Sequence, residues 1–189
     1  MLKWIGGILL ALVLLVGGSC WYAYRKLTGE GNVATVTVAA TPERVWQMLT
    51  EPDSIRTWFD STARVTFSTD SALVPGDTIT LRSQAAADSA REGMMLVLER
   101  AEAPALLVWR MVADSMGPGT ALLRRTDSVI ALGDSVRIVS VASTPSFDSL
   151  SDSMGGLGRR MMNASSRMVA GGFRLMAQHQ LEMLRGRLQ

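Results

Sequence analysis

The chain has 189 residues, with 19 Lys and Arg against 17 Asp and Glu, and 48% of its residues are hydrophobic. Residues 27–189 contain no Cys, no Lys and no Tyr, and a single His, His179. This composition excludes thiol nucleophiles, Schiff-base lysines, tyrosine acids and zinc sites built from Cys or several His. We therefore expect no catalytic residue of these kinds, no metal and no cofactor.

Charge is distributed unevenly along the chain. Residues 27–150 carry 10 Arg and 15 acids, whereas residues 151–189 carry 6 Arg and 2 acids. The basic C-terminal end would suit phosphates or an anionic membrane surface, or it is simply the solvated face of a helix. No basic patch is interleaved with aromatic residues, so we expect no nucleic acid partner.

Residues 1–26 are predicted to form a membrane anchor. Residues 4–24 carry no charge, and a helix of that length crosses the ~30 Å hydrocarbon core of a bilayer. Aromatic and basic residues stand at both ends of the segment, as in transmembrane helices. A cleaved signal peptide and a lipid attached to Cys20 are the alternatives. We expect a single-pass membrane protein whose side is undetermined, because the charges on the two flanks nearly balance.

A short linker, residues 27–32, separates the anchor from the domain predicted over residues 33–189. Six extended residues span at most about 20 Å. The domain would therefore lie close to the membrane surface.

Residues 33–59 predict a strand followed by two short helices. Val and Thr alternate over residues 33–39, as in a half-buried strand. Thr41 and Pro42 suit the start of a helix, and Pro52 ends it. A second short helix then leads to Trp58.

The next part of the chain is predicted to form six consecutive strands, joined by turns that contain Pro, Gly and Asp. The predicted strands cover residues 63–68, 78–84, 93–102, 105–113, 120–132 and 135–143. Nine of the ten aspartates are followed by serine. Because Asp and Ser side chains bond nearby backbone groups, we interpret these pairs as turn residues and not as metal ligands.

The C-terminal part is predicted to be a loop and one long helix. Residues 144–158 are small and polar, which is typical of a linker or of a loop that covers a site. Residues 159–188 then follow helical spacing. The apolar face is expected to comprise Met161, Ser165, Met168, Gly172, Leu175, His179 and Met183.

This order of elements resembles the START-like (SRPBCC) superfamily, which includes polyketide cyclase/dehydrase-like and lipid-transport domains. The segment TPERVWQMLTEPDSIRTWF is similar to the opening pattern of that family. The resemblance implies an α+β helix-grip fold, in which a curved antiparallel sheet of about seven strands surrounds the long C-terminal helix. It also implies an apolar cavity between the sheet and the helix.

Apolar side chains on the predicted strands and helix would line that cavity. Thioether side chains adapt to varied apolar shapes, which suits a lipid pocket, although the same residues would also fill a core. The cavity candidates are Leu96, Trp109, Arg110, Met111, Met161, Met168, Leu175, Met176 and His179.

Two of these candidates are polar. His179 is the one residue of the domain suited to act as a general base near neutral pH. Arg110 interrupts an apolar strand and would either anchor an acidic head group or pair with Glu99 or Glu102. No acid stands among the apolar stretches, so we identify no catalytic residues.

The sequence supports three functional hypotheses. The first is a bacterial-type, membrane-tethered domain that binds a hydrophobic or amphipathic, lipid-like ligand. The second is a cyclase- or hydrolase-type enzyme working through His179 or Arg110. The third is a module that binds a partner at the membrane, with its cavity filled by its own side chains.

Overall fold

A computed structural model of the chain describes residues 32–59, 63–83, 93–113, 121–144 and 155–189. The predicted anchor at residues 1–26, nearly all of the linker, and most of the 144–158 loop lie outside these ranges. Within the described ranges, no helix combines the length and the apolar character needed to cross a membrane.

The described residues form seven strands and three helices. The strand β1 (Val33–Val38) leads to the short helices α2 (Pro42–Thr50) and α3 (Pro52–Trp58). The remaining elements are β2 (Ala63–Phe67), β3 (Thr78–Ser83), β4 (Gly93–Glu102), β5 (Leu106–Ala113), β6 (Ala121–Leu132), β7 (Ser135–Ser143) and α5 (Gly156–Leu188). Each predicted strand is confirmed to within one residue at either end.

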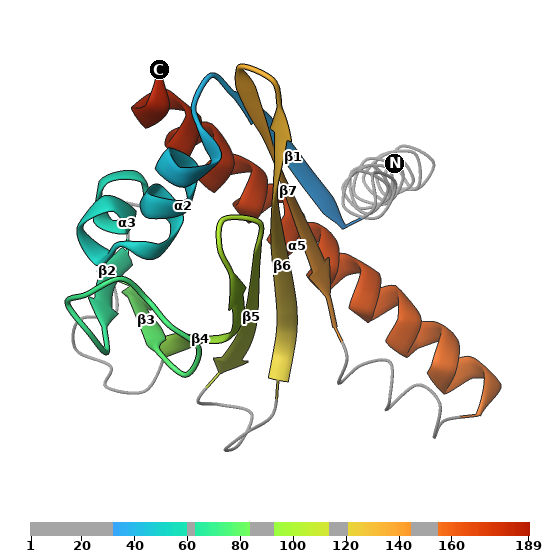
Figure 1. Cartoon of the computed structure of the whole chain (residues 1–189). Coiled ribbons are helices and arrows are strands. Elements are labelled where there is room, and N and C mark those ends of the chain that lie inside the picture. The colour runs from blue at the N-terminus through green and yellow to red at the C-terminus, as the bar shows by residue number, and fades with distance from the viewer. Residues whose placement is uncertain (1–31, 60–62, 84–92, 114–120, 145–154) are drawn as a thin grey trace, which may run out of the picture.

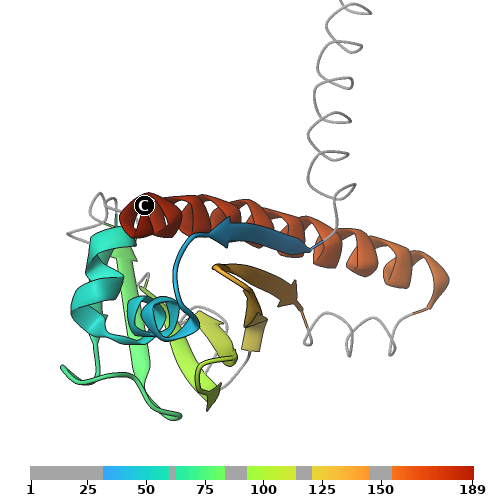
Figure 2. The same ribbon diagram turned by 45° about the horizontal axis from the view of Figure 1, so that its top comes forward.

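All seven strands belong to one antiparallel sheet, in the order β1-β7-β6-β5-β4-β3-β2. Sequential strands from β2 to β7 are neighbours, and β1 closes the sheet beside β7. The tight β6–β7 turn is possible because Gly133 adopts a φ of +65°, which favours glycine. The sheet curves, with α5 lying across its open side and α2 and α3 at one end (Figures 1 and 2). This arrangement confirms the predicted helix-grip fold.

The two short helices are fixed by local hydrogen bonds. The Thr41 hydroxyl accepts a hydrogen bond from the backbone N–H of Arg44 at 3.3 Å, which satisfies one free donor of the first turn of α2. The indole N–H of Trp58 donates to the carbonyl oxygen of Met48 at 2.7 Å, in a buried position. Trp58 therefore ties α3 to α2.

The inner face of the sheet carries the core. Along β4 and β5, alternate residues point inward, and Leu96, Leu98, Trp109 and Met111 are buried as their spacing predicted. The largest fully buried side chains come from the strands, from α3 and from the C-terminal half of α5: Ile55, Leu98, Leu107, Leu123, Ile138, Leu181 and Leu184.

The face of α5 that contacts the sheet differs from the predicted one. Its buried residues are Ala170, Gly171, Arg174, Ala177, Gln180, Leu181 and Leu184. The predicted apolar face, by contrast, lies on the solvent side of the helix, where Met161 is 66% exposed and Met168 is 40% exposed. That interpretation of the helix is therefore wrong. The small residues Ala170 and Ala177 lie on the buried side of α5, whereas the bulkier methionines point outward.

Candidate functional site

Two pockets lie between the inner face of the sheet and the helices. The first, here called the helix pocket, is lined by the strands and α5 and has an empty volume of about 410 Å³, counting open solvent. The second, the core pocket, is lined by the strands, α2 and α3 and has an empty volume of about 360 Å³ on the same basis. Both pockets are lined by Phe59, Leu96 and Arg125, so they adjoin one another.

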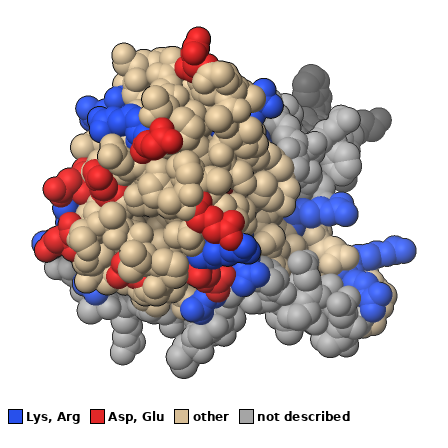
Figure 3. Space-filling view, in the orientation of Figure 1, with Lys and Arg blue, Asp and Glu red and all other residues tan. Residues whose placement is uncertain are grey.

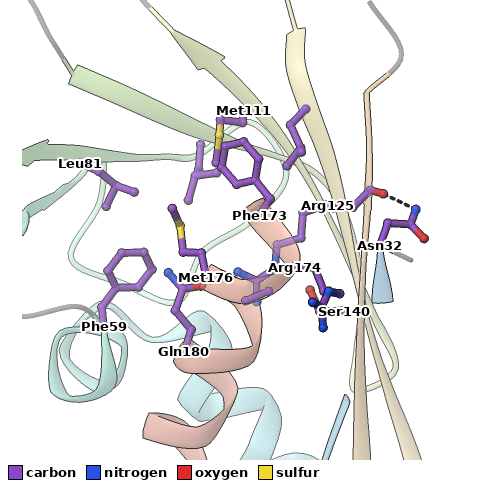
Figure 4. A pocket seen from close by; sticks show the side chains of 14 residues that line it. Asn32, Phe59, Leu81, Met111, Arg125, Ser140, Phe173, Arg174, Met176 and Gln180 are labelled. Atoms are coloured by element: carbon purple, nitrogen blue, oxygen red, sulfur yellow. Dashed lines mark hydrogen bonds between the residues drawn. The ribbon is translucent and has the colours of Figure 1, made fainter. Parts of the chain in front are cut away.

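The helix pocket has an apolar part and a polar part. Phe59, Leu81 and Met176 gather on one side of it, whereas Arg174 and Ser140 lie on the other (Figure 4). Arg174 and Ser140 are both buried. A pocket with this division suits a molecule that has an apolar body and a polar or anionic end.

Arg125 on β6 connects the two pockets through a buried polar cluster. Its Nε donates to Oδ1 of Asp127 at 2.8 Å, and one of its terminal nitrogens donates to Oε1 of Gln180 on α5 at 2.6 Å. The Arg125 side chain is 14% exposed and that of Asp127 is 2% exposed. Because a buried charge is costly unless it is paired and hydrogen-bonded, this cluster holds α5 against β6 in one position.

This cluster was not predicted from the sequence. Asp127 was interpreted as a turn residue because a serine follows it, but it lies within β6 and is buried, so that interpretation is wrong. The alternation of inward- and outward-facing residues along β6 indicates that Asp127 faces the core. Leu123, Arg125, Asp127 and Val129 share one face of the strand, and the apolar members of this set are core residues.

Four of the predicted cavity residues line the pockets. Leu96, Met111 and Met176 line the helix pocket, and Leu96 and Trp109 line the core pocket. The strand residues among them are buried, whereas Met176 is 43% exposed and lies at the edge of the site.

The other predicted cavity residues line neither of these two pockets. Met161, Met168, Leu175 and His179 lie on the exposed side of α5. The structure therefore does not bring His179 and Arg110 together in a common site.

Arg110 lies on the outer face of the sheet and forms an ion pair. Its Nε is 3.0 Å from Oε1 of Glu99, and Arg124 contacts the other oxygen of the same carboxylate at 2.9 Å. The predicted alternative of pairing with Glu99 is confirmed, and it explains how a charged residue fits within an apolar strand.

The described residues offer no metal centre. Within those ranges, no group of three or more His, Cys, Asp or Glu side chains is close enough together to hold an ion. The two pockets themselves are lined by apolar side chains, by the Arg125–Asp127 ion pair and by Arg174.

Solved structures with the same fold come from several bacteria. A protein from Arthrobacter aurescens aligns with a TM-score of 0.58 and 17% identity over 82% of this chain and 84% of its own. Protein Ms6760 from Mycobacterium smegmatis aligns with a TM-score of 0.53 and 15% identity over 83% and 89%. DynU16, a protein in the dynemicin biosynthetic locus, gives a TM-score of 0.54 and 13% identity over 82% of this chain. The chain spans 46% of the length of DynU16. At these identities the likeness shows the fold alone.

Comparison of sequences identifies the family. Among curated proteins, none matches the chain. The sequence pattern of the family described as "Polyketide cyclase / dehydrase and lipid transport" matches residues 33–188, which is nearly the whole predicted domain. The chain therefore belongs to the polyketide cyclase/dehydrase and lipid-transport family.

Proposed function

We propose that the chain binds a hydrophobic or amphipathic, lipid-like ligand between its sheet and α5, in a domain that is tethered to a membrane. The observation that carries the proposal is the helix pocket, where an apolar lining meets the buried Arg174 and the largely buried Arg125. Family membership supports a hydrophobic ligand-binding fold.

The lining explains how such a ligand would be held. Burying apolar ligand surface contributes roughly 25 cal/mol per Å². Arg125 and Arg174 would orient the polar end, because a charged hydrogen bond in a desolvated pocket is stronger than a neutral one. Most of the empty volume lies between side chains and at the mouth, so a larger ligand requires the lining to move. Met111 and Met176, with their flexible thioethers, suit such movement.

The membrane tether rests on the sequence. The uncharged segment at residues 4–24 is long enough to span a bilayer, and the linker to Asn32 is short. A topology reporter fused after Gln189 identifies the side on which the domain lies. Release of the full chain from membranes by alkaline carbonate would contradict the tether.

Native mass spectrometry of the full chain, purified in mild detergent, tests ligand binding. We expect a population whose mass exceeds that of the chain by one lipid-sized molecule, and we expect apolar fluorescent dyes to displace it. A chain that is consistently empty and takes up neither lipids nor dyes would contradict the proposal.

A partner-binding module is the second candidate function. The observation that favours it is the narrowness of both pockets, whose lining side chains already fill most of the interior. In that case the domain would be a packed scaffold, and no ligand would be recovered in the mass measurement.

A further inference from the structure

The solvent side of α5 carries a regular apolar stripe, defined here as Met161, Met168, Leu175 and Met183. The first three recur every seven residues, so they lie above one another on one side of the helix. All four are exposed. Between them stands Gly172, where an added Cβ would meet nothing within 4 Å. This side of the helix is therefore open.

The N-terminal half of α5 extends beyond the sheet. No described side chain from residue 158 to residue 169 is buried, and the first buried residue is Ala170. Figures 1 and 2 show this part of α5 running past the ends of the strands. A helix segment that buries no side chain against the described part of its domain is typical of one that contacts another surface.

The same half of the helix is basic. From Gly156 through Leu181, α5 contains no acid, and its exposed arginines include Arg160 and Arg167. These two lie one above the other along one edge of the apolar stripe, because they are also seven residues apart. In Figure 3, blue side chains project from the protruding end of α5, and no red side chain is visible there.

We propose that the apolar stripe and the basic edge of α5 lie on an anionic lipid surface. A helix with exposed apolar side chains and neighbouring arginines has the character of an interfacial helix. Its positive charge complements anionic headgroups, which attract basic residues close to a membrane.

The point where the chain enters the domain is consistent with this orientation. Asn32, the first described residue, lines the helix pocket together with Arg174 and Ala177 of α5. The following strand, β1, contacts the same helix, because the backbone N–H of Thr35 donates a hydrogen bond to Oε1 of Gln178. A linker that reaches about 20 Å can pass a helix about 10 Å in diameter. The inference thus rests on the proposed tether, which would place the bilayer within reach of α5.

A second copy of the chain fits this surface less well. Along its basic half, from Gly156 through Leu181, α5 has no acid to place opposite the arginines of a second copy, and like charges at such a contact are unfavourable. We therefore assign the surface to lipid.

An environment-sensitive fluorophore within the stripe tests the proposal. The full chain carries Cys20→Ser and Ser165→Cys, is labelled with nitrobenzoxadiazole, and is reconstituted into vesicles of neutral phosphatidylcholine with or without phosphatidylglycerol. We expect a blue-shifted emission and quenching by lipid-attached nitroxide in the anionic vesicles. A label at Ala131→Cys, an exposed position at the end of β6, is the control that stays in water.

Charge variants make the test specific. Substituting Arg160 and Arg167 with Gln should lower the ratio of docked to free label by about 25-fold, because each basic residue near an anionic surface contributes about fivefold. The matched control replaces Arg64 and Arg82, which are also exposed and lie on β2 and β3. It should leave the ratio unchanged.

Two outcomes would overturn the proposal, and a third identifies failure of the tether. A label that stays in water while the chain resists carbonate extraction contradicts docking but retains the tether. A blue shift that depends on protein density and not on lipid charge assigns the stripe to a second copy. Loss of the chain from the vesicles in carbonate contradicts the tether itself.

Discussion

The buried cluster on β6 gives the most direct prediction about stability. In Asp127→Ala, the Arg125 guanidinium loses its carboxylate at 2.8 Å and keeps only Gln180. Removing one partner of a buried ion pair costs about 3–5 kcal/mol, because the remaining charge is uncompensated. Since Arg125 retains one partner and is 14% exposed, we expect a loss near 3 kcal/mol at the lower end of that range.

Thermal unfolding of the full chain in detergent measures this loss, with tryptophan fluorescence and near-ultraviolet circular dichroism reporting on the domain. A loss near 3 kcal/mol lowers Tm by about 6–12 °C for a domain of this size. Arg125→Leu combined with Asp127→Leu should be less destabilising than Asp127→Ala, because no unpaired charge remains.

The chain contains a matched control for this experiment. Arg100 and Glu102 form an ion pair with the same spacing along a strand, but their side chains are 62% and 50% exposed. Glu102→Ala should cost less than about 1 kcal/mol, as exposed pairs do. If Asp127→Ala lowers Tm no more than Glu102→Ala does, the buried pair contributes no more to stability than the exposed one, contrary to this prediction.

Three further predictions concern the fold. In denaturant unfolding, Leu181→Ala should lower the free energy of unfolding by about 2–5 kcal/mol. Met168→Ala, on the exposed side of α5, should lower it by less than about 0.5 kcal/mol. Equal losses in the two variants would contradict the assigned helix face. Trp58→Phe leaves the buried Met48 carbonyl without its donor, which should cost about 1–3 kcal/mol in the same assay, and an unchanged midpoint would contradict the role of this bond. Gly133→Ala should cost about 1–2 kcal/mol because φ is positive there, and a stabilised variant would rule out that turn geometry.

The strands could be predicted from the sequence because their signals are local. Alternation of apolar and polar residues identifies each strand, and residues such as Gly133 mark the turns between them. The antiparallel neighbours then follow from the short connections. The opening segment with Thr41, Pro42 and Pro52 was predicted for the same reason, since caps and prolines act on their own helix.

The orientation of α5 could not be predicted in this way. Its methionines at positions 161 and 168 are the more apolar residues, whereas the true sheet-facing side carries the small Ala177 and the polar Arg174 and Gln180. Choosing the buried face of α5 by side-chain hydrophobicity alone therefore selects the exposed side of the helix. What decides the orientation is the burial of Leu181 and Leu184 in the core and the hydrogen bond from Arg125 to Gln180, which joins residues 55 positions apart.

The polar part of the site was missed for a related reason. An Asp-Ser pair looks the same in a turn and within a strand, and nine such pairs occur in the chain. Only the alternation with Leu123 and Val129 separates Asp127 from the others. Because Asp127 was interpreted as a turn residue, its ion pair with Arg125 was not predicted.

Ligand binding in the helix pocket is tested most directly by blocking it at the mouth. Met176 lines the pocket and is 43% exposed, whereas Met183 on the same helix is 40% exposed and lines neither described pocket. In native mass spectra of the full chain, we predict that Met176→Trp loses the lipid-sized adduct and that Met183→Trp retains it. An adduct equally abundant in both variants, or absent from the unaltered chain, would contradict the proposed function.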